Sequence, residues 1–92
     1  MSIAQLIREK ITAALAPDAL EVIDESHLHA GHASAPAGGE SHFRLLIVAE
    51  AFSGLSHVAR QRLVNAALKE ELAGSIHALS MKTLTPNEAA SD

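Results

Sequence analysis

Two stretches of the sequence repeat apolar residues every three or four positions, and this spacing predicts helices that each bury one side. The first covers residues 2–15 and the second covers residues 57–73. Their apolar positions are Ile3, Leu6, Ile7, Ile11, Ala14 and Leu15, and then Leu63, Val64, Ala67, Leu68 and Leu72. A chain of 92 residues has room for one domain, so both helices must cover a single small core.

The ends of the two helices carry their own signals. Ser2 and Gln5 form a capping box at the start of the first helix, and Pro17 ends it. Ser56 can cap the second helix. Gly74 predicts a left-handed residue at the end of that helix.

Three shorter apolar segments predict strands at residues 20–24, 43–49 and 76–84, because they alternate or carry β-branched residues. We expect the first two to pair antiparallel. Residues 27–41, rich in His, Ala, Gly and Ser, predict a flexible loop. The polar residues 85–92 predict a frayed tail.

The predicted order is therefore helix, strand, strand, helix, strand, within one domain that covers residues 1–92. Helices and sheet can bury their apolar sides only against each other. The expected fold is an α+β two-layer sandwich, with a three-stranded sheet, helices on one of its faces, and the other face partly exposed.

The composition argues against several classes of function. Seven Lys and Arg against eleven Asp and Glu leave a net charge of -4, which provides no general attraction to nucleic acid. No apolar run reaches the length of a membrane span, and no signal peptide is visible, so we expect a cytoplasmic protein without membrane contact. The sequence has no nucleophile elbow, phosphate-binding loop or dinucleotide fingerprint, so we do not expect an enzyme.

The strongest chemical signal is an excess of histidine, six residues in a chain without cysteine. His27, His29 and His32 lie in the predicted loop, His42 lies just downstream, and His77 lies at the start of the third predicted strand. Neutral imidazole is a common ligand of zinc, copper, iron and nickel. The alternatives are an exposed loop that binds zinc or nickel adventitiously, and for His77 an ordinary imidazole at the edge of the sheet.

A second signal is the local basic side of the second helix, formed by Arg60, Arg62 and Lys69. It could contact nucleic acid or an acidic partner. The alternative is a solvated helix face whose charge Glu70 and Glu71 partly neutralise.

Four motifs stand in a characteristic order. They are V-I-D-E-S at residues 22–26 before the His-bearing loop, E-S-H-F at 40–43, F-x-G-x-S-x-x-x-R-x-R-x-V-N at 52–65, and I-H-A-L at 76–79 with T-P at 85–86. In this order and at these separations they resemble the BolA family, over about residues 3 to 88. The resemblance implies a helix-strand-strand-helix-helix-strand order related to type II KH domains, with a short helical turn near residues 56–61 ahead of the second long helix.

The resemblance also implies a function. BolA-like proteins are partners of monothiol glutaredoxins, with which they share a bridging 2Fe-2S cluster, and some are DNA-binding regulators. This chain would then be a non-enzymatic adaptor in iron-sulfur cluster handling or iron sensing. This chain would hold a cluster only in the mixed complex, where it displaces one glutaredoxin from a cluster-bridged homodimer and where a glutaredoxin cysteine and glutathione supply the thiolates. The free protein would be a monomer.

The same resemblance assigns ligands. His77 matches the C-terminal ligand of the family, and His29 best matches the loop ligand. The loop is longer than usual and adds His32, which remains an alternative loop ligand. His42 would lie beside the ligands or replace one of them.

Nucleic-acid binding through a KH-like surface is the alternative function, and it would use Arg60, Arg62 and Lys69. A KH domain approaches the phosphate backbone with a G-x-x-G loop. Residues 52–56, F-S-G-L-S, have only one glycine, which counts against this function.

Overall fold

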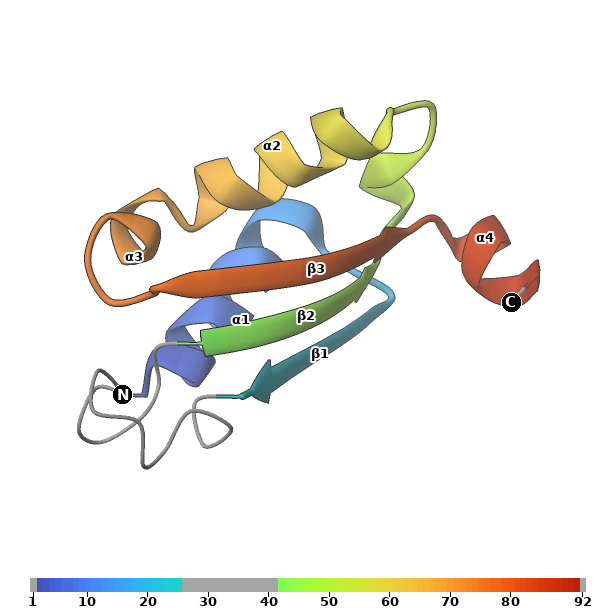
Figure 1. Ribbon diagram of the computed structural model, residues 1–92. Helices are drawn as coiled ribbons and strands as arrows, with labels where there is room; N and C mark the ends of the chain where they lie inside the picture. Colours follow the sequence, from blue (N-terminus) through green and yellow to red (C-terminus); the bar gives the residue numbers. More distant parts are fainter. Residues whose placement is uncertain (1, 26–41, 92) are drawn as a thin grey trace.

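The computed structural model describes residues 2–25 and 42–91. Eight helical and strand segments follow each other along this part of the chain (Figure 1). They are α1 (Ile3–Leu15), β1 (Ala19–Asp24), β2 (His42–Val48), the 3-10 helix η2 (Glu50–Phe52), α2 (His57–Ala67), α3 (Lys69–Ala73), β3 (Ala78–Leu84) and α4 (Pro86–Ser91). The predicted α+β class and the three strands are confirmed.

The three strands form one mixed sheet in the order β1-β2-β3. β1 pairs antiparallel with β2, as the sequence predicts, whereas β2 pairs parallel with β3. Parallel neighbours cannot be joined by a tight turn, so the chain must return over the length of the sheet before β3 begins. Here η2, α2 and α3 make that return.

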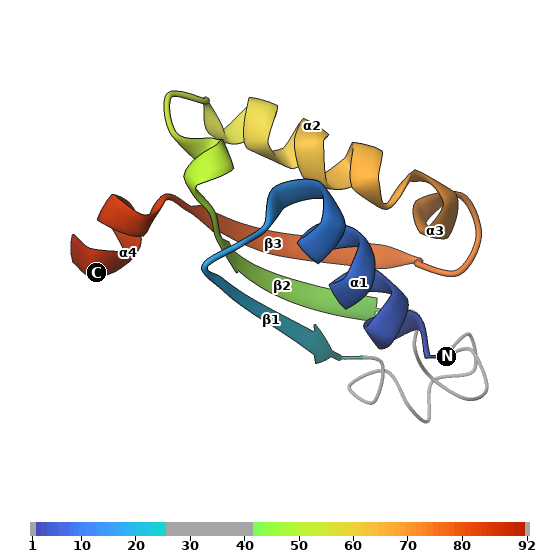
Figure 2. The ribbon, with the colours of Figure 1, turned by 180° about the vertical axis from the view of Figure 1, so that it is seen from behind.

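The long helices α1 and α2 pack on the same core beside this sheet, and Figure 2 shows α1 in front of the sheet and α2 running along β3. The side chains of the helix-facing side alternate with those of the open side along β2, where Phe43, Leu45 and Ile47 are buried. Together with buried positions on α1 and α2 they form a single core. Its members are Ile7, Ile11, Leu15, Phe43, Leu45, Ile47, Ala49, Phe52, Val64, Leu68 and Ile76.

The predicted start and end of the first helix are confirmed. The Ser2 hydroxyl accepts a hydrogen bond from the Gln5 backbone N–H at 3.1 Å. The helix ends at Leu15, its C-cap Ala16 has a left-handed φ of 44°, and Pro17 follows. The Ala16 N–H still donates to the Thr12 carbonyl at 3.0 Å, so the last turn remains closed.

The second helix is divided, in contrast to the single helix predicted over residues 57–73. The break lies at Leu68, which is fully buried with φ -108° and ψ 21°. The Leu68 N–H donates to the Val64 carbonyl and the Leu68 carbonyl accepts from the Leu72 N–H, so both backbone polar groups of Leu68 stay paired at the break. The helix-helix order implied by the family resemblance is thus present, but the division lies at Leu68 and not near residues 56–61.

Two further sequence predictions are wrong. The tail is not frayed, because α4 occupies Pro86–Ser91. Gly74 is not left-handed, since its φ is -131°, and a side chain there would meet only the Glu70 carbonyl oxygen at 3.9 Å. The third strand begins at Ala78, so His77 directly precedes it.

Candidate functional site

Three strand ends meet at one edge of the sheet. Because β2 and β3 are parallel, their first residues lie side by side, and His42 pairs in register with Ala78. Because β1 is antiparallel to β2, its last residue Asp24 pairs there with Phe43. The sheet topology thus brings His77, which directly precedes Ala78, next to His42.

The two imidazole rings are neighbours at this edge. Their centroids are 6.2 Å apart and their planes meet at 67°, an edge-to-face arrangement. His77 is exposed and His42 is half-buried. A shallow hollow of about 200 Å³ adjoins His42, and its other lining residues are Glu25, Phe43, Ala78, Leu79 and Ser80.

The histidine-bearing segment leaves and rejoins the sheet at the same edge. His27, His29 and His32 lie outside the described residues, so their positions stay predictions. The described residues on either side of the segment are Glu25 and His42, and the Glu25 N–H donates to the His42 carbonyl at 2.8 Å. Both ends of the segment are therefore held beside the imidazole pair.

The described residues supply two imidazoles to this edge but no complete metal site. In residues 2–25 and 42–91, no group of three or more His, Cys, Asp or Glu could hold a metal ion. Imidazole nitrogens are common ligands of transition metals, so the two rings could form part of a ligand set. Any metal bound here needs further ligands from the segment at residues 26–41 or from another molecule.

Arg60, a candidate nucleic-acid contact, has a structural role. Its side chain is buried, with a residue exposure of 5%, and the guanidinium donates to the Leu55 carbonyl at 3.1 Å and the Thr83 carbonyl at 3.0 Å. It also donates to both Glu88 oxygens, at 2.7 and 3.1 Å, and lies 5.9 Å from the centroid of the Phe52 ring. Its charge is directed into the fold and away from any external phosphate.

The partner of Arg60 is held by a capping box. The Glu88 carboxylate accepts from the Thr85 N–H at 2.9 Å, and the Thr85 hydroxyl accepts from the Glu88 N–H at 3.1 Å. The guanidinium, and then the Thr85 N–H, lower the pKa of Glu88 from 4.5 to about 2. Sequence reasoning missed this cluster although T-P-N-E at residues 85–88 is a capping box with proline at the first helical position.

The other two basic residues of this helix region remain at the surface. Arg62 on α2 and Lys69 on α3 are exposed. The turn before α2 contains Gly54 with φ 81°, a backbone conformation that favours glycine. Of the three basic residues predicted to form a surface, two are exposed, and the acidic Glu70 beside Lys69 is exposed as well.

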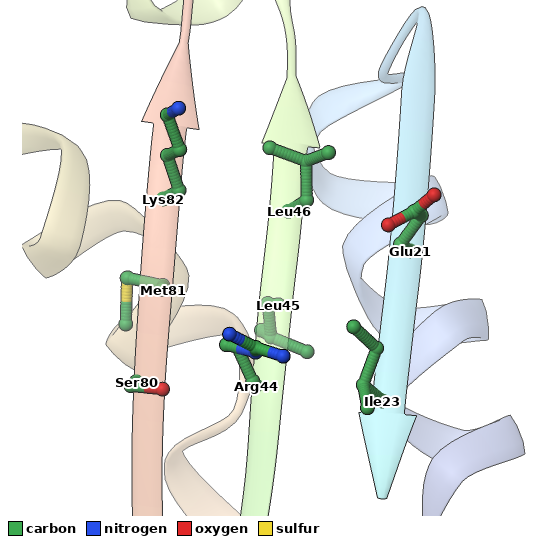
Figure 3. Close-up of a pocket in the computed structure, with 8 residues that line it drawn as sticks. All are labelled: Glu21, Ile23, Arg44, Leu45, Leu46, Ser80, Met81 and Lys82. Carbon is green, nitrogen blue, oxygen red and sulfur yellow. The ribbon is translucent and has the colours of Figure 1, made fainter.

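The open face of the sheet carries a second, wider hollow of about 460 Å³ (Figure 3). It confirms that this face is partly exposed. Ile23 and Leu46 form its apolar part, and Glu21, Arg44 and Lys82 bring charges of both signs. Arg44 lies 3.4 Å from the Glu25 carboxylate.

No helix within the described part of the chain is long and apolar enough to cross a membrane.

Comparison with known proteins gives a consistent result. A family model described as "BolA-like protein" matches residues 11–88. An uncharacterized protein in the cobS 5' region of Sinorhizobium sp. is 47% identical over 89 residues, which cover 96% of each chain. The "DNA-binding transcriptional regulator BolA" of Escherichia coli K12 is 42% identical over 88 residues, covering 96% of this chain and 80% of the other.

A solved structure supports the same relationship. The BolA domain of SufE1 from Arabidopsis thaliana superposes with a TM-score of 0.84 at 46% identity, and 96% of each chain is covered. The matches in sequence and in fold both extend over most of this chain, so the chain belongs to the BolA family.

Proposed function

We propose that this protein is a non-enzymatic adaptor that binds a monothiol glutaredoxin and helps to hold a 2Fe-2S cluster between the two proteins. The observation that carries the proposal is the imidazole pair at one sheet edge, where the histidine-bearing segment also begins and ends. The family relationship makes such a partnership a reasonable expectation. The adaptor would act in iron-sulfur cluster handling or iron sensing.

The proposal assigns a role to each histidine at the edge. His77 supplies an exposed imidazole from a fixed backbone position, and His29 supplies the second ligand from the loop, with His32 as its alternative. His42 lies against His77 and orients it or replaces a loop ligand. The partner must supply thiolates, because this chain has no cysteine.

Imidazole binds iron in its neutral form, and protonation of the ring competes with the metal. A cluster held partly by histidine should therefore be lost on acidification sooner than one held by thiolates alone. The mixed complex should have a visible circular dichroism spectrum that differs from that of a cluster held by the glutaredoxin alone.

The test is anaerobic mixing with a monothiol glutaredoxin, glutathione, iron and sulfide, followed by size-exclusion chromatography monitored at the cluster absorption bands. We expect His77→Ala to reduce the cluster content of the mixed complex and to change its visible circular dichroism. Comparing His29→Ala with His32→Ala identifies the loop ligand. An unchanged spectrum in His77→Ala would refute the ligand assignment.

A matched control is available in the same chain. His57 is an exposed histidine at the start of α2, and His57→Ala removes the same chemical group from a helix outside the imidazole edge. It should leave the cluster spectrum unchanged. If His57→Ala and His77→Ala have equal effects, the loss reflects a general change and not a lost ligand.

Nucleic-acid binding is the second candidate, favoured by the name of the Escherichia coli relative. In this chain it would use exposed Arg62 and Lys69, because Arg60 is buried and paired with Glu88. A phosphate contact should weaken steeply as salt increases and should be lost in Arg62→Glu. The absence of any duplex-DNA shift at low salt would reject it.

A further inference from the structure

We propose that the ion pair between Lys10 and Glu71 positions His77, by fixing the turn that leads from α3 into β3. The inference rests on the proposed function, because it concerns how a ligand is presented. Lys10 and Glu71 are positioning residues and do not contact the metal themselves.

The pair joins two elements that are far apart in sequence. The Lys10 ammonium on α1 donates to both oxygens of Glu71 on α3, at 3.0 and 2.7 Å, across 61 positions of the chain. The Glu71 side chain is 9% exposed and that of Lys10 is 31% exposed. A charge-assisted contact with a nearly buried carboxylate is stronger than an ordinary surface pair.

Glu71 also holds the turn through its backbone. Its carbonyl oxygen accepts from the Gly74 N–H at 3.2 Å and from the Ile76 N–H at 2.8 Å. Two backbone N–H groups of the turn between α3 and β3 therefore donate to the same carbonyl oxygen. Movement of Glu71 would loosen the position of Ile76, which is 4% exposed and belongs to the core.

His77 depends on these contacts because its own side chain is exposed. Few packing contacts hold an exposed ring, so its position is set mainly by the backbone on either side of it. On the C-terminal side, Ala78 pairs in register with His42. On the N-terminal side, Ile76 is held by the core and by the Glu71 carbonyl, so Lys10 acts on the backbone directly before His77.

Charged neighbours of the pair act in the same direction. The pKa of the Lys10 ammonium is raised mainly by the hydrogen bond that it donates to Glu71, and the negative charge of Glu70 raises it further. The Lys10 ammonium in turn lowers the pKa of Glu71. Both groups are charged at neutral pH, where the positioning would be needed.

The experiment measures His77 in the isolated chain, without iron or glutaredoxin. In Lys10→Met we expect amide exchange at Ile76 to become about tenfold faster, the effect of losing a charge-assisted hydrogen bond. We also expect the NMR contact between the His42 and His77 rings to weaken. Lys10→Arg keeps the charge and should restore both signals.

Glu88→Gln serves as the matched control, because it removes one partner of a different ion pair, Arg60–Glu88. It should leave the Ile76 exchange rate and the ring contact unchanged. The proposal is overturned if Lys10→Met leaves both signals as in the wild type, or if Glu88→Gln changes them equally.

The two proposals fail in different experiments. A second arm compares the mixed cluster complexes of Lys10→Met and Glu88→Gln, where Lys10→Met should retain about tenfold less cluster at equal partner concentration. Equal retention by both variants would overturn the positioning role. The ligand role of His77 is instead overturned by an unchanged spectrum in His77→Ala.

Discussion

The Arg60–Glu88 pair predicts a defined acid dependence of stability. Glu88 has its pKa lowered from 4.5 to about 2 in the folded protein, first by the guanidinium and then by the Thr85 N–H. A carboxylate with a depressed folded pKa stabilises the fold above its unfolded pKa, and this contribution is lost as the pH falls toward the folded value. Most of the loss should therefore occur between pH 4.5 and about pH 2.

The magnitude follows from the two pKa values. A difference between 4.5 and about 2 means that folded Glu88 holds its proton about 300-fold more weakly than the unfolded chain does. Since 42% of the Glu88 side chain is exposed, solvent and salt screen part of this interaction. In 1 M salt the screening length falls to roughly 3 Å, so the interaction with Arg60 weakens. We therefore expect the folded pKa of Glu88 to move back toward 4.5 in 1 M salt.

Two measurements test this reasoning. A ¹³C titration of the side-chain carboxyl groups reports the pKa of Glu88 directly. Urea denaturation of the wild type and of Glu88→Gln, repeated between pH 7 and pH 2, should show a gap in stability that is constant above pH 5 and closes on acidification.

The control is Glu9→Gln, which removes an exposed carboxylate on α1. Its stability relative to the wild type should show no comparable closing between pH 5 and pH 2. A Glu88 titration near 4.5, or a gap of the same size at pH 7 and pH 2, would refute the assigned contact.

Four further substitutions test the fold. Ile47→Ala removes a fully buried side chain from the central strand and should cost about 2–5 kcal/mol in urea denaturation, whereas Arg62→Ala at an exposed position should cost less than about 0.5 kcal/mol. Ser56→Ala removes the oxygen that accepts from the Ala59 N–H at 3.1 Å, and a loss of about 1 kcal/mol, visible as a lower Tm, is expected. Gly54→Ala should cost about 1 kcal/mol of stability, because the φ of 81° at this position disfavours a residue with a side chain. Nothing lies within 4 Å of an added Cβ, so no steric clash adds to this cost. A neutral or stabilising result would contradict the left-handed backbone at Gly54.

Local patterns predicted the elements better than their boundaries. The apolar repeat predicts one helix over residues 57–73, and all of these positions except Leu68 are helical. The repeat does not show the break at Leu68. The repeat reports only which side chains face the core, and Leu68 belongs to the core although the helix breaks there. A change of helix direction depends on what the next segment contacts, and that information lies elsewhere in the chain.

The basic cluster shows a different limit. The positive charge of Arg60, Arg62 and Lys69 within one helical stretch predicts a single basic surface. The structure separates them, since Arg60 turns inward to a carboxylate 28 positions away. Charge type is visible in a sequence, whereas the partner of a charge is a tertiary contact.

By itself the sequence determined the class of fold, the faces that are buried and the kinds of ligand available, because periodicity, capping residues and composition are local properties. The tertiary structure alone decided that β2 and β3 run parallel, and so that His77 lies beside His42. It also decided which ion pairs form, including Lys10 with Glu71 across 61 positions. Such contacts depend on how the helices and the sheet pack together, and no short stretch of sequence contains that information.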